Sequence, residues 1–283
     1  MVVSYGLGRK YVHAKLIFKI GFSAIFSEKY AKYGSERLFL GYRIHILDEI
    51  LRNFTARNKK KDAIMLIYDL GSGAEAFSTN IDDPLDFEVT LPLHQAHGTR
   101  IVEVDRNGPQ DDTYGADALI TGERGVRIGV KTADCVPVLL YDPEIPAAAA
   151  VHSGWKGTVA NISALTVKRM TEAYGARPRD IKAVIGPCIH MEAFEVGDEL
   201  YDIFSAAGYA DFCHRMPRYG TADGVKWHID LPGICKAQLM ECGLEDIETR
   251  GECTYTLHHR FYSARRLGRN FGKQRIISCI RLL

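Results

Sequence analysis

Hydrophobic residues from position 65 onward fall into short runs with polar turns between them, a pattern typical of β-strands joined by tight connections. Residues 99–104 (TRIVEV) alternate apolar and polar side chains, and residues 136–142 (VPVLLYD) and 147–152 (AAAAVH) are almost continuously apolar, as in buried strands. The four runs between residues 116 and 152 have short connections, which favours one sheet. Further strands are predicted at residues 65–70, 75–79, 116–121, 126–132, 181–187, 247–255 and 275–282.

Helical spacing of apolar residues marks three later segments. Residues 158–174 carry an apolar stripe, and Gly175 predicts the end of that helix. Residues 198–207 and 231–241 predict two more helices. Strands and helices interspersed in this way indicate a mixed α/β (α+β) fold, whose strand order the pattern does not define.

The first 64 residues differ in kind from the rest of the chain. They carry a net charge of +8, so residues 65–283 carry −7, although the whole chain has only +1. Residues 35–53 predict one amphipathic helix, and a lysine run follows at residues 59–61. We therefore expect a basic, non-catalytic N-terminal extension at 1–64 and a catalytic domain at 65–283. The alternatives are an arm that binds nucleic acid or lipid, and an extension upstream of a natural start at Met65.

Composition excludes several classes of protein. Apolar residues at 46% and charged residues at 25% are ordinary for a globular protein, and the small net charge argues against a nucleic-acid or membrane partner. The seven cysteines are an odd number without any Cys-x-x-Cys spacing, which favours reduced thiols in a cytoplasm. No apolar run reaches the ~18 residues that a membrane-spanning helix needs.

Three short segments combine metal-binding side chains with glycine or proline: residues 94–98 (HQAHG), 131–137 (KTADCVP) and 151–157 (VHSGWKG). Within them, His97, Cys135 and His152 are predicted to form a metal site, because two imidazoles and a thiolate suit zinc and leave a fourth position for water or substrate. Zinc lowers the pKa of bound water towards ~7, which provides a nucleophile at neutral pH. A buried structural cysteine and a Cys–His nucleophile remain alternatives.

Other polar residues are candidates for catalysis and anion binding. Asp134, beside Cys135, is predicted to orient a ligand histidine or to act as a general base, and Asp117 is a weaker candidate of the same kind. Lys156 lies in a glycine-rich turn that opens a predicted helix and suits a phosphate or carboxylate. Arg265 and Arg266 form a pair that also suits phosphate. A tight turn and an exposed charge pair are the structural alternatives.

Seven motifs, in order, make the chain from about residue 65 to 283 resemble the laccase-domain family, whose members are called polyphenol oxidase, purine nucleoside phosphorylase or peptidoglycan editing factor. They are QAHG, DALIT, TADCVPVLLYD, HSGWKGT, IGPCI, FEVG and FYSARR. The resemblance implies layered mixed sheets with helices, of the cytotoxic-necrotizing-factor-like cysteine hydrolase type. It also implies a metal site of His, Cys and His, at His97, Cys135 and His152.

The resemblance further implies phosphorolysis of adenosine, inosine and methylthioadenosine, and deamination of adenosine, with a purine nucleoside and phosphate as partners. Zinc is the expected metal and copper an alternative, although ten histidines without a His-x-His pair do not supply the several centres of a laccase. The alternatives are a cytoplasmic hydrolase that edits peptidoglycan precursors, and a non-catalytic metal-binding protein with His94 or Cys188 as fourth ligand. Trp155 and Phe261 are the aromatic residues expected to contact a purine.

Overall fold

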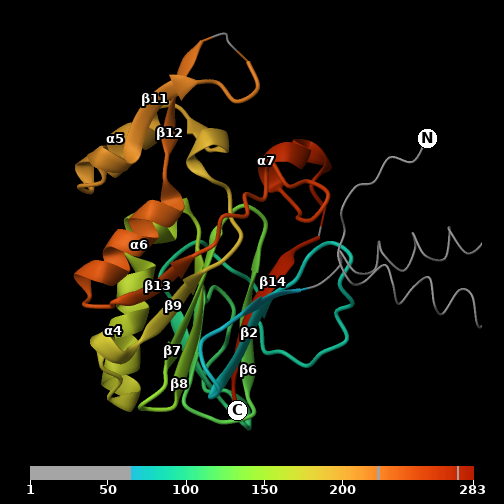
Figure 1. Cartoon of the computed structure of the whole chain (residues 1–283), viewed down its shortest axis with the longest axis vertical. Helices are drawn as coiled ribbons and strands as arrows, with labels where there is room; N and C mark the ends of the chain where they lie inside the picture. The colour runs from blue at the N-terminus through green and yellow to red at the C-terminus, as the bar shows by residue number, and fades with distance from the viewer. Residues whose placement is uncertain (1–64, 222–223, 273) are drawn as a thin grey trace, which may run out of the picture. The chain divides into compact units, whose positions relative to one another are not determined.

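The computed structural model describes residues 65–221, 224–272 and 274–283. The described chain forms three sheets and five α-helices, which confirms the mixed α and β architecture (Figure 1). The likeness to cysteine hydrolases stays a prediction. So does the domain boundary, because residues 1–64, with the predicted helix at 35–53 and the lysine run, lie outside the described residues.

The largest sheet has seven strands in the order β13-β9-β7-β8-β5-β3-β4. Its bounds are β3 Ile101–Asp105, β4 Gly108–Pro109, β5 Ala118–Thr121, β7 Val136–Asp142, β8 Ala147–Ser153, β9 Lys182–Ile185 and β13 Asp246–Thr249. The hairpin of β7 and β8 pairs Pro137 with His152 and Val136 with Ser153. This register places Cys135, which directly precedes β7, beside the end of β8.

A second sheet has four strands in the order β1-β2-β14-β6: β1 Leu66–Tyr68, β2 Ala74–Ser78, β6 Arg127–Thr132 and β14 Ile276–Leu282. The prediction of one sheet between residues 116 and 152 is therefore wrong, because β6 leaves its neighbours in sequence and pairs with the last strand of the chain. That partner, β14, also pairs with β2, so the end of the chain occupies the middle of this sheet.

The hydrophobic core has two parts, because the side chains of β7 and β8 alternate between the two faces of their sheet. Val138 and Ala149 belong to the cluster formed with helices α4 and α6, whereas Leu139 and Ala150 belong to the cluster formed with the four-stranded sheet. Figure 1 shows α4 and α6 on one side of β7, β8 and β9, and β2, β6 and β14 on the other. Burial on both faces explains the continuous apolar runs of these two strands.

The helices are α3 Trp155–Val159, α4 Ile162–Tyr174, α5 Asp198–Ala206, α6 Leu231–Glu241 and α7 Ala264–Leu267, with single 3₁₀ turns at Pro178–Asp180, Met191–Ala193, Ala210–Phe212 and Gly268–Asn270. The continuous helix predicted for residues 158–174 is wrong at its start. Asn161 adopts a left-handed conformation, with φ of 62°, and separates α3 from α4. Gly175 ends α4, as predicted, and the structure shows it in the left-handed conformation.

A third sheet, which the pattern did not predict, has the order β10-β12-β11, with β10 Glu195–Val196, β11 Cys213–Pro217 and β12 Val225–Ile229. Tyr201 of α5 stacks on Trp227 of β12 at a ring distance of 3.7 Å and covers this sheet. Two of its strands are largely exposed and lack a regular apolar alternation, which explains why they were missed. Of the helices within the described residues, none has the length and hydropathy to span a membrane.

Candidate functional site

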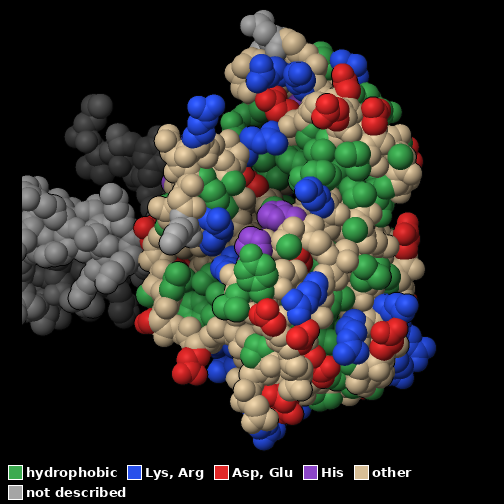
Figure 2. Space-filling view, turned by 180° about the vertical axis from the view of Figure 1, so that it is seen from behind, with side chains coloured by type: hydrophobic (Ala, Val, Ile, Leu, Met, Phe, Trp, Pro, Cys, Tyr) green, Lys and Arg blue, Asp and Glu red, His purple; other side chains and the backbone are tan. Residues whose placement is uncertain are grey.

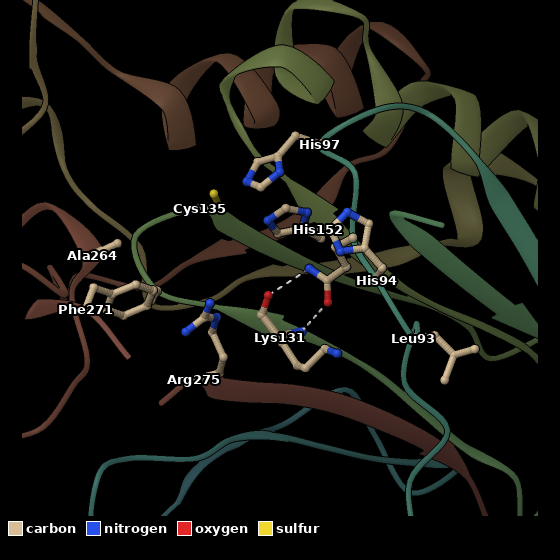
Figure 3. Close-up of a pocket in the computed structure, with 11 residues that line it drawn as sticks. Leu93, His94, His97, Lys131, Cys135, His152, Ala264, Phe271 and Arg275 are labelled. Atoms are coloured by element: carbon tan, nitrogen blue, oxygen red, sulfur yellow. Dashed lines mark hydrogen bonds between the residues drawn. The ribbon is translucent and has the colours of Figure 1, made fainter. Parts of the chain in front are cut away.

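His97, Cys135 and His152 come together at one end of the seven-stranded sheet. The β7–β8 hairpin brings Cys135 and His152 together, and the loop before β3 carries His97 across them. One ligand atom from each residue lies within 4.8 Å of the other two, and the two imidazole rings are 4.7 Å apart at 78°. The three residues predicted from separate sequence segments therefore form one group that could hold a metal ion (Figure 3).

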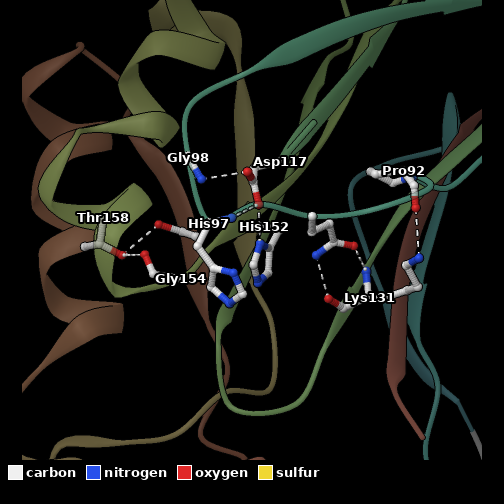
Figure 4. A network of polar contacts seen from close by, with 10 residues as sticks. Pro92, His97, Gly98, Asp117, Lys131, His152, Gly154 and Thr158 are labelled. Atoms are coloured by element: carbon white, nitrogen blue, oxygen red, sulfur yellow. Dashed lines mark hydrogen bonds and ion pairs between the residues drawn. The ribbon is translucent and has the colours of Figure 1, made fainter. Parts of the chain in front are cut away.

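Asp117 links two members of this group. Its Oδ1 lies 2.7 Å from His152 Nδ1 and accepts the backbone N–H of His97 at 2.9 Å, while its Oδ2 accepts the backbone N–H of Gly98 at 2.7 Å (Figure 4). Asp117 is fully buried and directly precedes β5. Because Nδ1 of His152 is engaged in this way, Nε2 is the nitrogen left to face Cys135 or a metal.

The charges of Cys135 and His152 stabilise each other. Burial alone raises the pKa of Cys135, but the charge of His152 and hydrogen bonds from His152 and His97 outweigh it and lower that pKa to about 6. Burial lowers the pKa of His152, but the charge of Cys135 and the hydrogen bond to Asp117 outweigh it and raise that pKa to about 9. The thiol is thus prepared to act as a thiolate, the form that binds metals.

Gly154 makes the close approach of these side chains possible. A Cβ atom at this position would lie 2.5 Å from His97 Cδ2 and 3.3 Å from Cys135 Sγ. The backbone of Gly154, with φ of −71° and ψ of 166°, is open to any residue, so space and not conformation requires glycine here. His97 itself has a positive φ of 61°, a strained conformation of the kind found at functional sites.

The group contains three protein ligands and no fourth within the described chain. Of the two residues considered as a fourth ligand, Cys188 is fully buried elsewhere in the core, and His94 stacks on Tyr114 at 5.0 Å. A site with three protein ligands leaves a coordination position open, as in catalytic zinc centres.

Asp134 makes different contacts from those predicted. Its Oδ1 accepts the hydroxyl of Thr254 at 2.7 Å, and its Oδ2 accepts the hydroxyl of Ser263 at 3.1 Å and the backbone N–H of Arg265 at 2.6 Å. The buried carboxylate thus ties the Cys135 loop to the start of α7. Asp117, and not Asp134, contacts and orients His152. A general-base role for Asp134 stays a prediction.

None of the three residues predicted to bind phosphate lines the pocket that contains His97, Cys135 and His152. Lys156 is exposed, with Nζ 5.4 Å from the Trp155 ring. Arg265 is exposed, donates to the carbonyl of Glu195 at 2.7 Å and lies over the Phe194 ring. Arg266 donates to the backbone carbonyls of three residues, Thr254, Tyr255 and Phe261. The guanidinium of Arg266 therefore holds its own loop, and phosphate binding by the three stays a prediction.

A pocket of about 600 Å³ opens beside His97, Cys135 and His152. Figure 2 shows histidine side chains in a hollow of this face, with basic side chains around it. The pocket is lined by Leu93, His94, Gln95, His97, Lys131, Ala133, Cys135, His152, Ala264, Phe271 and Arg275 (Figure 3). Phe261 is fully buried and cannot contact a ligand, and Phe271 is the phenylalanine that lines the pocket.

Sequence reasoning missed Lys131, Phe271 and Arg275. Lys131 is the first residue of the KTADCVP segment, so its position beside Cys135 was a usable signal. Arg275 precedes β14, whose pairing with β6 brings it opposite that segment. Nothing in the local sequence indicates this pairing, because the two strands are far apart along the chain.

Comparison with known proteins gives consistent results. Residues 78–282 match the family described as multi-copper polyphenol oxidoreductase laccase. A purine nucleoside phosphorylase of Bacteroides thetaiotaomicron is 42% identical over 198 residues, which cover 67% of this chain and 72% of that protein. Adenosine deaminase RL5, from an unknown prokaryotic organism, is 36% identical over 200 residues, which cover 67% and 74% respectively. The hypothetical protein YfiH of Bacillus licheniformis shares the fold, with a TM-score of 0.67, 23% identity and coverage of 78% and 97%.

Proposed function

Given that the chain belongs to the multi-copper polyphenol oxidoreductase laccase family, we propose that it is a zinc-dependent purine nucleoside phosphorylase that also deaminates adenosine. The observation that carries the proposal is that His97, Cys135 and His152, which could hold a metal ion, line a pocket of about 600 Å³. That volume suits a small organic ligand such as a nucleoside. Relatives named purine nucleoside phosphorylase and adenosine deaminase support the substrate class, with adenosine, inosine and methylthioadenosine as proposed substrates.

The donor set fits zinc. Two imidazole nitrogens and a thiolate are ordinary zinc ligands, and Asp117 supplies the outer carboxylate that commonly orients a ligand histidine. When bound, zinc supplies a Lewis acid that polarises substrate oxygens and activates water. Copper also binds such a set, but the chemistry of a multi-copper oxidase needs several centres, and the described residues hold one group of this kind.

The side chains around His97, Cys135 and His152 have separate roles in the proposed reaction. Asp117 holds His152 in one tautomer and fixes the His97 loop through two backbone N–H groups. Phe271 presents a ring to the pocket, and His94, stacked on Tyr114, presents a second flat surface. These rings form the aromatic surface that a purine base requires, in place of the predicted Trp155 and Phe261.

The test is to incubate the zinc-loaded full chain with adenosine, with and without phosphate, and to separate the products by chromatography. We expect adenine and ribose 1-phosphate only with phosphate present, and inosine in either case. Cys135→Ala and chelation of the metal should abolish both activities. Inosine alone would leave only the deaminase part of the proposal. No turnover of any purine nucleoside would refute the proposal and favour hydrolysis of peptidoglycan precursors.

A further inference from the structure

Two basic side chains in the pocket wall have no acidic partner. Lys131 and Arg275 are both half-buried, and neither makes an ion pair with any carboxylate of the described chain. Arg127, which is also largely buried and lies on the same sheet, differs because Glu75 pairs with it at 2.7 Å. Half-buried charge without compensation is costly, so a ligand of opposite charge is the simplest reason to keep it.

The contacts of both side chains fix their positions without neutralising them. Lys131 Nζ donates to the carbonyl of Pro92 at 2.8 Å, and two hydrogen bonds with Gln95 hold the Lys131 backbone. Arg275 donates through one nitrogen to the carbonyls of Gly272 and Gln274 at 2.9 and 2.8 Å. Its guanidinium lies 4.2 Å from the centre of the Phe271 ring. Both cations are therefore held before any ligand binds.

The electrostatics of the wall agree with an anion site. Burial first, and the charge of Arg275 second, lower the pKa of Lys131. Burial also lowers the pKa of Arg275, and the thiolate of Cys135 partly offsets this. An anion between the two cations would relieve both the burial and the repulsion. Figure 3 shows the guanidinium of Arg275 on the side of the pocket towards Cys135, whereas the side chain of Lys131 runs from beside it towards Leu93. An anion held by Arg275 would therefore lie near His97, Cys135 and His152.

We infer that Lys131 and Arg275 bind the inorganic phosphate that attacks the nucleoside. This assignment rests on the proposed phosphorylase function and replaces Lys156, Arg265 and Arg266 as the phosphate site. In the reaction, an oxygen of hydrogen phosphate forms a bond to the anomeric carbon of the ribose as the glycosidic C–N bond breaks. The electron pair of that bond goes to the purine nitrogen, and the proton of hydrogen phosphate ends on the released base. Deamination uses water and needs no such site.

The kinetic test compares Lys131→Met and Arg275→Met with Lys168→Met, which removes an exposed lysine on α4. Each pocket variant should raise the KM for phosphate at least about tenfold, because it removes a charge-assisted hydrogen bond to the anion. Tenfold corresponds to about 1.4 kcal/mol. In Lys168→Met, the KM for phosphate, the KM for adenosine and the rate of phosphate-independent deamination should all stay within about twofold of the wild type. In the two pocket variants, the KM for phosphate should change more than the KM for adenosine or the rate of deamination does. An unchanged KM for phosphate in both pocket variants would overturn the inference.

A binding measurement separates this inference from the proposed function. Inorganic phosphate should raise the Tm of the wild type and of Lys168→Met, but not that of Arg275→Met, because only a ligand that binds the folded state stabilises it. Equal stabilisation of all three proteins would overturn the inference. Stabilisation by adenosine 5′-monophosphate but not by inorganic phosphate would also overturn it and assign the cations to a nucleotide. If phosphate stabilises as expected but no phosphorolysis occurs, the anion site stands and the proposed function fails.

Discussion

Gly154→Ala provides a sharp test of the metal-binding group, because it adds one methyl group where the structure has no room. The new Cβ would lie 2.5 Å from His97 Cδ2, whereas ordinary contacts begin at 3.4 Å. His97 would have to move by about 0.9 Å, which exceeds the roughly 0.5 Å within which a functional site must be held. His97 lies on an exposed loop, so the loop and not the buried strand β8 is expected to give way.

The size of the effect follows from this displacement. A misplacement of about 1 Å costs on the order of 10²-fold in catalysis, and a disturbed ligand shell costs about 10–100-fold in metal affinity. Folding should suffer little, because alanine tolerates the backbone angles of Gly154. We therefore expect a loss of metal and activity that is out of proportion to the change in stability.

Gly197→Ala is the matched control. Gly197 also precedes a helix, with φ of −82° and ψ of 170°, but an added Cβ there meets nothing within 4 Å. Both variants carry the same helix-capping cost of about 1 kcal/mol or less, so the difference between them isolates the contact with His97. Metal content is measured by titration against a competing chelator, and stability by urea unfolding. The reasoning is refuted if Gly154→Ala binds metal as tightly as Gly197→Ala does.

Three other predictions follow from the same geometry. Asp117→Asn should weaken metal binding by about 10–100-fold, because His152 loses its anionic partner; chelator competition at wild-type affinity would contradict this. Asp134→Asn should lower the free energy of unfolding by about 2 kcal/mol, because three hydrogen-bond donors lose a charged acceptor. Asparagine is chosen because it tolerates the positive φ of this position. An unchanged midpoint of urea unfolding would count against this prediction. In metal-free protein, the thiolate absorbance of Cys135 should persist at pH 7 and disappear as the pH falls through about 6, with no such step in Cys135→Ala; a midpoint near the ordinary thiol value of ~8.5 would refute it.

Local patterns predicted the elements that carry the site better than their assembly. The apolar runs of β7 and β8 were recognisable because both faces of these strands are buried. Two of the three residues that could hold a metal ion were noticed because Cys135 directly precedes the first run and His152 lies at the end of the second. The position of β6 was not predictable, because its partner β14 lies at the other end of the chain. Strand pairing at such separation depends on tertiary packing and leaves no local pattern.

Adjacency in the sequence also misled the choice of the carboxylate beside the histidines. Asp134 precedes Cys135, but its positive φ of 93° accompanies contacts with Thr254 and Ser263 instead. Asp117 is 35 residues from His152 and reaches it because β5 and β8 are paired. Pairing between strands thus decided which acidic residue meets the histidine, and this was not visible before the sheet was known.

The four alanines of β8 keep the side chains small along the strand that carries His152. Ala147 to Ala150 are fully buried, with Ala147 and Ala149 in the cluster of the helices and Ala148 and Ala150 in the cluster of the second sheet. A larger side chain there would force the layers apart and shift the strand. Natural variation at these positions would then be recorded as loss of enzyme activity, although the altered residue never meets a ligand. Surveys of variants that score activity alone would place such interior changes among active-site changes, and only a parallel measurement of folding would tell them apart.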